Sequence, residues 1–352
     1  MTKIANIAII GMGIGKANAR GFMNNPRCRV AALCDISAER MEEAVVALNL
    51  PADTKRYTTT AALCADPEID AIFVGVPNQY HVPVALEVVR AGKHVMVTKP
   101  LADALPPARE LVAAAEAAGV VNMMSLSTRF APDVQYLGRM QQAGGFGDIY
   151  YARARSVRRI GIPGWNLGFI QKGGGAFRDM GVHVLDSAWW LMGMPKPVSV
   201  SGVAGAKFGP RGEGFWTIYP PAKPINELAK LYDSDDYGGG FIRFENGAGL
   251  QVESFWASHQ PEELNIELFG EEAGAKLKPM TVYRSNDGAT QDVTVHLPEA
   301  PRDIAWNNLA DHFVECILDG VACQAPLRHG LIVQEMMEAL LESAKAGKEM
   351  RL

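Results

Sequence analysis

The stretch KIANIAIIGMGIG (Lys3–Gly15) decides the fold of this chain. The apolar run Lys3–Ile10 is typical of a buried strand, and glycines follow it before a segment, Gly15–Asn24, that can form a helix. Glycines at such a turn let the backbone approach a bound group closely, and the free N–H groups of a helix N-terminus favour an anion such as pyrophosphate. The third glycine comes one residue earlier than in the usual GxGxxG fingerprint. The stretch still predicts a dinucleotide-binding turn made by Gly11, Met12, Gly13, Ile14 and Gly15.

A second apolar run, Arg29–Cys34, ends at Asp35. An acid about 20 residues beyond the glycine turn is placed to bind the two ribose hydroxyls of a dinucleotide, although Asp35 is also suited to cap the helix that follows it. Because a carboxylate repels a 2′-phosphate, NAD is favoured over NADP, while the nearby Arg40 keeps NADP open.

Further apolar runs follow at 71–76, 94–98 and 120–125, alternating with helical segments. Nearly continuous apolar strands separated by helices indicate a parallel sheet covered on both faces, and ligands bind beyond the carboxyl ends of such strands. Two strand ends are therefore expected in the cofactor site. They supply Val76, Pro77, Asn78 and His81 from one, and Thr98, Lys99 and Pro100 from the other.

The pattern changes after about residue 125. A helix at 132–143, a strand at 149–157, a hairpin signal at Glu245–Gly247 and an irregular segment at 208–236 predict a helix-backed, mostly antiparallel sheet. We expect a first domain at 1–124 and a second at 125–352, with the last helix packing back on the first domain.

Length, charge and cysteine content limit the class of protein. A chain of 352 residues suits two domains, and its net charge of -5 argues against nucleic acid as the main partner. No apolar run reaches the roughly 18–20 residues that span a bilayer, and the N-terminal segment shows no signal-peptide pattern. Five scattered cysteines without a CxxC pair favour reduced thiols. We therefore expect a cytoplasmic protein without a membrane or nucleic-acid partner.

Asp179 and His183 lie in the stretch GGGAFRDMGVHVLDSAWW (Gly173–Trp190). If the chain is helical from Met180 onward, residues four apart share a face. A carboxylate beside an imidazole is the minimal general-base unit, because it fixes the ring tautomer and raises its basicity. The pair also suits metal binding together with Asp186, but the chain offers no strong third histidine or cysteine ligand there, so we expect no metal.

Together these motifs resemble the Gfo/Idh/MocA family, named for glucose–fructose oxidoreductase and inositol dehydrogenase. The resemblance covers nearly the whole chain. It rests on the glycine turn, the acid after the second strand, AGKHVMVTKPLA (Ala91–Ala102), the GGGxxxDxGxHxxD pattern (Gly173–Asp186), the strand pair around FENG, and the closing EALLESAKAGKEMRL. It implies an α/β Rossmann N-terminal domain and an α+β C-terminal domain with a large, mostly antiparallel open sheet. The implied activity is NAD(P)-dependent hydride transfer between nicotinamide and a secondary hydroxyl or carbonyl of a sugar, cyclitol or sugar derivative.

The resemblance also implies roles for single residues. Lys99 contacts the reacting hydroxyl, His183 is the general acid/base, and Asp179 orients the sugar or the histidine. Two positions depart from the family pattern: Thr98 replaces the glutamate before the lysine, and Asn18 replaces a histidine after the glycine turn. Other substrate contacts are expected from Arg129, Arg155, Trp165, Asn166, Asp186 and Tyr237, with Trp165 stacking on a sugar face.

Two other functions stay open on the sequence. Some relatives use NAD only transiently to cleave a glycosidic bond, and a non-catalytic NAD-binding regulator can use the same fold. By analogy with the family, a homodimer or homotetramer is expected.

Overall fold

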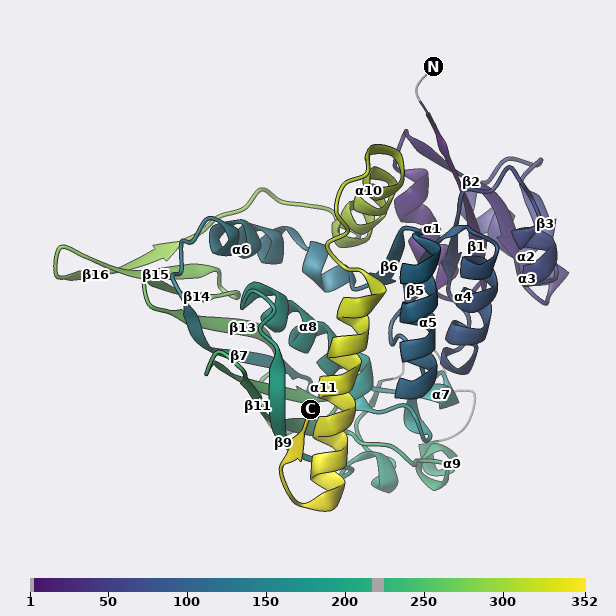
Figure 1. Ribbon diagram of the computed structural model, residues 1–352. Coiled ribbons are helices and arrows are strands. Elements are labelled where there is room, and N and C mark those ends of the chain that lie inside the picture. The colour runs from purple at the N-terminus through teal and green to yellow at the C-terminus, as the bar shows by residue number, and fades with distance from the viewer. Residues whose placement is uncertain (1–2, 217–224) are drawn as a thin grey trace. The chain divides into compact units, whose positions relative to one another are not determined.

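The computed structural model describes residues 3–216 and 225–352, and the chain forms two compact units (Figure 1). The first unit is Met1–Ala131 with Ala300–Ile332, and the second is Pro132–Glu299 with Val333–Leu352. The expected division at 124 and 125 differs from this mainly in residues 300–332. These pack with the N-terminal residues because the apolar face of their helix joins the first core, where Phe313 contacts Phe22 edge-to-face.

The first unit is a parallel sheet flanked by helices. The strand order is β3-β2-β1-β4-β5-β6, and every pair in it is parallel. Its elements are β1 (Ala5–Ile10), α1 (Gly15–Met23), β2 (Cys28–Cys34), α2 (Ala38–Leu48), β3 (Lys55–Tyr57), α3 (Thr60–Cys64), β4 (Ala71–Val74), η1 (Asn78–Tyr80), α4 (His81–Arg90), β5 (His94–Thr98), α5 (Leu105–Ala118), β6 (Asn122–Ser125), η2 (Ser127–Phe130) and α10 (Ile304–Asp319).

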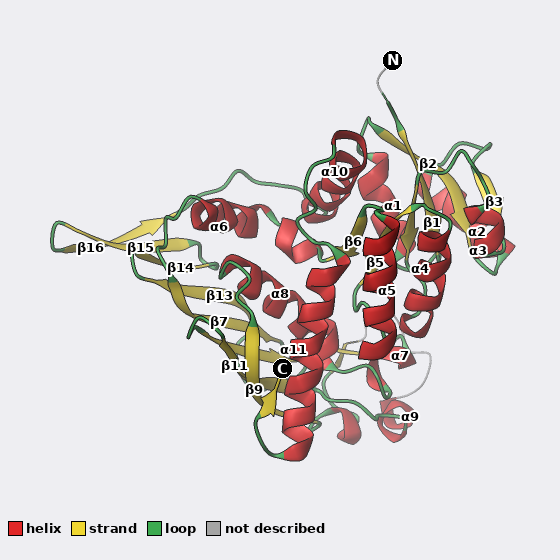
Figure 2. Cartoon of the chain, in the orientation of Figure 1, coloured by secondary structure: helices red, strands yellow, loops and turns green. Residues whose placement is uncertain are grey.

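The second unit is built on a large sheet, drawn in yellow in Figure 2. Its strand order is β16-β15-β14-β13-β7-β12-β11-β9-β17, and among the described pairs of this sheet only β7–β12 is parallel. Its elements are α6 (Pro132–Gln142), β7 (Ile149–Val157), β8 (Ile162–Pro163), α7 (Leu167–Ile170), the π-helical turn η3 (Phe177–Gly181), α8 (Val182–Leu191), β9 (Pro197–Gly205), η4 (Gly209–Arg211), β10 (Phe215–Trp216), α9 (Ile225–Lys230), β11 (Tyr237–Phe244), β12 (Gly249–Phe255), β13 (Glu263–Gly270), β14 (Ala273–Lys276), β15 (Thr281–Asn286), β16 (Ala289–Thr294) and β17 (Met350–Arg351). The helix α11 (Leu327–Ala346) begins in the first unit and continues into the second.

The predicted fold class is confirmed in both units. The expected hairpin is β11 and β12, with Gly247 in the left-handed region at the turn (φ +85°). Residues 217–224 of the expected irregular segment lie outside the described residues, and the described remainder contains η4, β10 and α9. Among the described residues, no helix combines the length and apolarity needed to cross a bilayer.

Candidate active site

The glycine turn between β1 and α1 has the shape of a ligand cradle. Gly11 has φ +88°, and a Cβ on it would lie 2.4 Å from the carbonyl oxygen of Gly75. A Cβ on Gly15 would lie 2.8 Å from the side chain of Ile9. Gly13 differs, because a Cβ there would meet no described atom within 4 Å and its φ is not positive. The protein's own packing therefore requires Gly11 and Gly15, whereas Gly13 leaves open space at a helix N-terminus, as a closely bound pyrophosphate requires.

Asp35, at the end of β2, anchors this turn. One oxygen of its buried carboxylate accepts the Met12 backbone N–H (2.9 Å), and the other accepts the Ser37 N–H (3.0 Å). The side chain of Ser37 caps α2 by accepting the Arg40 N–H (3.3 Å). Asp35 thus positions both the turn and the start of the next segment. Its predicted contact with a ribose remains a prediction, for which each carboxylate oxygen keeps a second lone pair.

His81 contacts both of the segments that follow β4 and β5 and that are predicted to line the cofactor site. Its Nδ1 lies 2.7 Å from the Pro100 carbonyl oxygen, and its Nε2 lies 2.8 Å from that of Val76. A neutral ring donates to only one of these oxygens, and an imidazolium donates to both. Burial lowers the pKa of His81 and outweighs the two hydrogen bonds, which act in the opposite direction. The ring of His81 therefore lies between the segments after β4 and β5, inside the first unit.

Asn78, in the segment after β4, carries an unsatisfied acceptor. Its Oδ1 is buried and has no hydrogen-bond partner among the described residues. A buried amide oxygen without a partner is costly in a folded protein. The orphaned atom therefore fits a donor from a bound dinucleotide, and together with the open space at Gly13 it shows that the described residues suit this cofactor.

Lys99 follows the last residue of β5. Thr98 is buried, and Lys99 is partly exposed and precedes a cis peptide bond to Pro100. The ammonium group is thus carried at the carboxyl edge of the parallel sheet, the edge at which such sheets bind ligands.

Asp179 and His183 lie on different kinds of helix, which corrects the expectation of one regular helix from Met180. Asp179 belongs to the π-helical turn η3, and His183 to the first turn of α8. A π turn widens the helix, so a four-residue separation no longer follows the regular α-helical spacing. Single π turns inserted in α-helices are frequent at functional sites. The sequence pattern gave no sign of this turn.

His183 is the one residue of α8 that is not buried. Every other position from Val182 to Leu191 is packed into the core, including Asp186 at 1% exposure. His183 is thus the side chain of this helix that is partly exposed to solvent. Asp186, by contrast, has the burial of a structural residue.

Trp256 supports Asp179 from the end of the β12 strand. Its fully buried indole donates a hydrogen bond from Nε1 to Oδ2 of Asp179 (3.1 Å), and Ser254 on the same strand donates to the Ala176 carbonyl oxygen (3.0 Å). These bonds tie the π turn to the sheet. Trp256 was not among the predicted site residues, and the signal for it is the aromatic pair Phe255–Trp256 near the end of the motif FENGAGLQVESFWA.

The glycines before the π turn approach their own chain. A Cβ on Gly174 would lie 1.9 Å from the Phe169 carbonyl oxygen, and one on Gly175, which has φ +112°, would lie 2.0 Å from the Asp235 carboxylate. Asp235 accepts the Phe177 N–H (2.9 Å), and burial raises the pKa of its carboxyl. At these two glycines the close neighbour is therefore the protein's own backbone and a carboxylate that holds η3.

Trp165 and Asn166 lie at the start of α7. Trp165 is 42% exposed and meets Trp216 edge-to-face, with ring centroids 5.3 Å apart. Asn166 caps α7 by accepting the Gly168 N–H (2.9 Å). Trp165 also meets Phe169, which packs against a buried cluster that includes Trp256, the hydrogen-bond partner of Asp179, so Trp165 shares a neighbourhood with Asp179.

The structure separates Arg155 and Tyr237 from that neighbourhood. Strand side chains alternate between faces, and Ser156, the neighbour of Arg155, is paired with Ser254, which bonds toward η3. Arg155 therefore lies on the opposite face, where it pairs with Glu263 (3.0 Å) and Glu253 (3.4 Å). Tyr237 stacks on Phe255, which shares the Glu253 face.

Arg129 is a buried residue of the first unit. Its guanidinium donates to the Gln324 carbonyl oxygen and to Nδ1 of His329 (3.2 Å), and its exposure is 0%. These contacts join η2 to the segment before α11 and to the first turn of α11. The expectation of substrate contacts from Arg129 is not supported by this burial.

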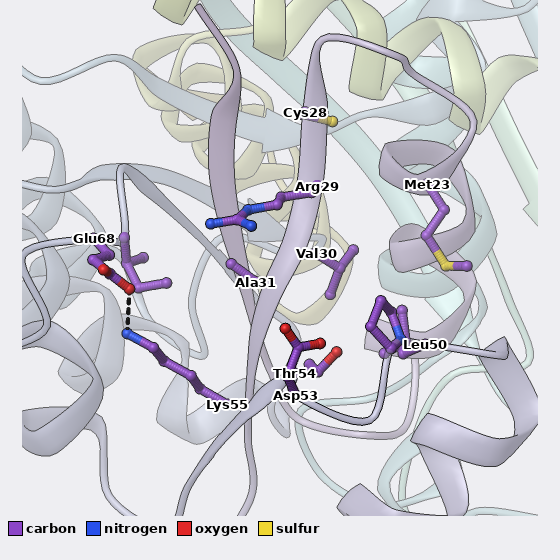
Figure 3. Close-up of a pocket in the computed structure, with 12 residues that line it drawn as sticks. Met23, Cys28, Arg29, Val30, Ala31, Leu50, Asp53, Thr54, Lys55 and Glu68 are labelled. Carbon is purple, nitrogen blue, oxygen red and sulfur yellow. Dashed lines mark hydrogen bonds and ion pairs between the residues drawn. The ribbon is translucent and has the colours of Figure 1, made fainter.

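A cavity of about 320 Å³ in the first unit lies away from these residues (Figure 3). Its lining includes Cys28 and Arg29 at the start of β2, with Lys55 and Glu68 forming an ion pair of 2.6 Å beside it. Asp35 and the glycine turn lie at the other, carboxyl end of the strands. The cavity is thus distinct from the dinucleotide cradle.

Comparison with known proteins agrees with this geometry. Residues 5–126 match the model of an oxidoreductase family with an NAD-binding Rossmann fold, and residues 134–276 match the GFO/IDH/MocA C-terminal domain. D-glucoside 3-dehydrogenase of Escherichia coli (strain K12) is 30% identical, covering 98% of this chain and 97% of its own length. D-apiose dehydrogenase of Paraburkholderia graminis is 24% identical, covering 98% of this chain and 89% of its own.

Among solved structures, levoglucosan dehydrogenase in complex with NADH and levoglucosan has the same fold, with a TM-score of 0.83, 22% identity and 99% of each chain covered. The two matched family models together span most of the chain, in the order that the sequence motifs predicted. The protein belongs to the Gfo/Idh/MocA family of oxidoreductases, with an NAD-binding Rossmann domain and the family's C-terminal domain.

Proposed function

We propose that this protein is an NAD-dependent dehydrogenase of a sugar, cyclitol or sugar derivative, and that its substrate is a glucoside oxidised at C3. The observation that carries the proposal is the accessible His183 on an otherwise buried helix, next to a π turn that holds Asp179. The substrate class is supported by the 30% sequence identity with D-glucoside 3-dehydrogenase of Escherichia coli over 98% of this chain.

The proposed chemistry assigns one task to each of three side chains. Bound NAD supplies the acceptor for the hydride that leaves the carbinol carbon. His183 takes the hydroxyl proton, because an imidazole titrates near working pH. Lys99, as an ammonium, stabilises the negative charge that develops on the oxygen. In the reverse direction the same two groups polarise a carbonyl and return the proton.

Asp179 serves as the positioning carboxylate in this proposal. Trp256 donates a hydrogen bond to its Oδ2, which holds that carboxylate oxygen in place. From that position it orients either the ring of His183 or a hydroxyl of the substrate. Thr98, which replaces the family glutamate, lies buried at the end of β5 and leaves Lys99 without a carboxylate as its immediate N-terminal neighbour in the sequence.

Trp165 and Asn166 are the proposed substrate contacts beyond this trio. A half-exposed indole offers an apolar face on which a pyranose ring stacks. For the cofactor, Asp35 favours the ribose diol of NAD over a 2′-phosphate. The nearby Arg40 keeps NADP as the alternative cofactor, because a guanidinium can bind that phosphate.

We also propose a cytoplasmic homodimer or homotetramer. The five cysteines are free thiols, which suits a reducing compartment. The sheet face opposite η3 carries the exposed apolar side chain of Val203, at 64% exposure, as well as the ion pairs of Arg155. Such a surface suits self-association.

The test is a substrate screen followed by product identification. Methyl and aryl glucosides, their epimers, inositols and sugar acids are incubated with NAD or NADP, and the absorbance of the reduced cofactor is followed. We expect NADH to accumulate with glucosides and NMR to locate a ketone at C3. Aglycone release without NADH accumulation would instead indicate transient oxidation, and NAD binding without turnover of any sugar would indicate a regulator.

A further inference from the structure

Three side chains that can bind a metal meet at the end of α10, inside the first unit. His312 and Cys316 are four residues apart on one face of this helix, and Cys323 returns to them after the left-handed turn at Gly320 (φ +69°). One ligand atom from each lies within 4.8 Å of those of the other two. Among the described residues, this is the group of histidine, cysteine and acidic side chains with metal-binding spacing.

The distance between two of the ligand atoms suits a cation with tetrahedral coordination. The Cys316 Sγ lies 3.5 Å from the His312 Nε2. Zinc binds thiolate sulfur at about 2.3 Å and imidazole nitrogen at about 2.0–2.1 Å, which places the two ligand atoms about 3.6 Å apart in a tetrahedral site. A Cys₂His set with one open position is an established way of holding zinc. We propose that His312, Cys316 and Cys323 form a binding site for a thiophilic divalent cation such as Zn²⁺.

Cysteine binds a metal as a thiolate, so each of the two sulfurs that coordinates the cation releases its proton to solvent on binding.

Access to the site comes through the loop after α10. His312 and Cys316 are buried, whereas Cys323 is partly exposed and the preceding residues Val321 and Ala322 are exposed. At present the His312 Nε2 accepts the Gln324 N–H (2.9 Å), so the cation competes with this bond. Binding therefore includes a local shift of the exposed loop that frees the nitrogen lone pair.

The test measures zinc directly in the full-length protein. Protein reduced with a phosphine and freed of metal is titrated with ZnCl₂ against a chromophoric chelator. We expect one zinc per chain with sub-micromolar affinity, and an affinity at least about tenfold weaker for Cys323→Ser. Cys323 is the least buried of the three ligands, so this variant keeps the fold, which circular dichroism verifies. Cys64→Ser, a partly buried cysteine in α3, is the matched control and should bind as wild type does.

Cobalt provides a second reading that does not depend on affinity. Co²⁺ bound to the wild type should show thiolate-to-metal charge-transfer absorption, and this absorption should fall by about half in Cys316→Ser and in Cys323→Ser, because each loses one of two thiolates. Equal zinc uptake by the wild type and Cys323→Ser would overturn the proposal. So would the absence of zinc uptake by reduced protein, including the case in which peroxide converts Cys316 and Cys323 into a disulfide.

Discussion

At the scale of single residues, the structure gives several predicted ligand contacts a second partner within the protein. Asp35 was expected to bind a ribose, and it also accepts two backbone N–H groups that shape the glycine turn. A substitution there changes the turn and the cofactor contact together. The informative variant is therefore the one that keeps an oxygen acceptor.

Asp35→Asn is expected to weaken NAD binding by about tenfold and to narrow the preference for NAD over NADP, because the charge that repels a 2′-phosphate is gone. Titration calorimetry with both cofactors measures this. Asp53→Asn, at an exposed position of the same unit, is the control. An unchanged NAD to NADP ratio would count against the ribose contact.

Trp256→Phe tests the support of Asp179. It removes the indole N–H while keeping an aromatic ring in the core, so we expect kcat to fall by about tenfold and its pH profile to shift, with a small change in KM. The control is Trp189→Phe, which removes another buried indole bond, to the Pro195 carbonyl oxygen (2.8 Å), away from Asp179. Equal losses of kcat in the two variants would show that Trp256 acts only through stability.

At the scale of elements, two turns carry the residues of the proposed site, and the sequence predicted one of these turns but not the other. The glycine turn was visible because its glycines follow an apolar strand. The π turn was not, since one extra residue per turn leaves no mark on the apolar pattern of Phe177–Leu191. Strand alternation was also missed at Arg155 and Tyr237, because the facing of a strand depends on pairing partners that are distant in the sequence.

Gly13→Ala and Gly11→Ala are expected to separate ligand binding from folding. At Gly13 the added methyl enters open space, so the thermal midpoint should stay within about 1 °C while NAD binding weakens at least about tenfold. At Gly11 the methyl meets the Gly75 backbone, so the first unit should lose stability. Calorimetry of both variants, with and without NAD, checks this pair. Undiminished NAD affinity in Gly13→Ala would contradict the cradle.

At the scale of the whole molecule, the composition, the order of elements and the motifs of the sequence were enough to predict two domains and the family. They did not reveal that residues 300–332 join the first unit, because that depends on which core the apolar face of α10 meets. The short strand β3 (KRY) was likewise not predicted, because two of its three residues are charged and it lacks the apolar pattern of a buried strand. The candidate catalytic residues Lys99, Asp179 and His183 were named from motif spacing, and their roles stay a prediction.

The first unit should lose stability in mild acid. The pKa values of His81, His94 and His329 all lie below the ordinary 6.5, mainly because burial disfavours the charged ring, and that of His329 falls to about 4. The unfolded chain therefore binds these protons first, and stability falls as pH drops below about 6.5, by at most about 1.4 kcal/mol per pH unit for each ring.

Calorimetry between pH 7.5 and 5 should show the midpoint of the first unit falling by several degrees, with little change between pH 7.5 and 8.5. His329→Gln should lessen this fall, because it removes the ring that accepts from Arg129. A midpoint that rises on acidification would contradict the buried neutral histidines.

The central claim, that His183 accepts the proton in sugar oxidation, is tested most directly by the turnover of His183→Asn with saturating NAD and glucoside. The account predicts that kcat falls by about 10²–10⁴-fold while the affinity for NAD stays as in the wild type, and that His259→Asn, at an exposed histidine, keeps full activity. A kcat of His183→Asn within about twofold of the wild type would contradict it.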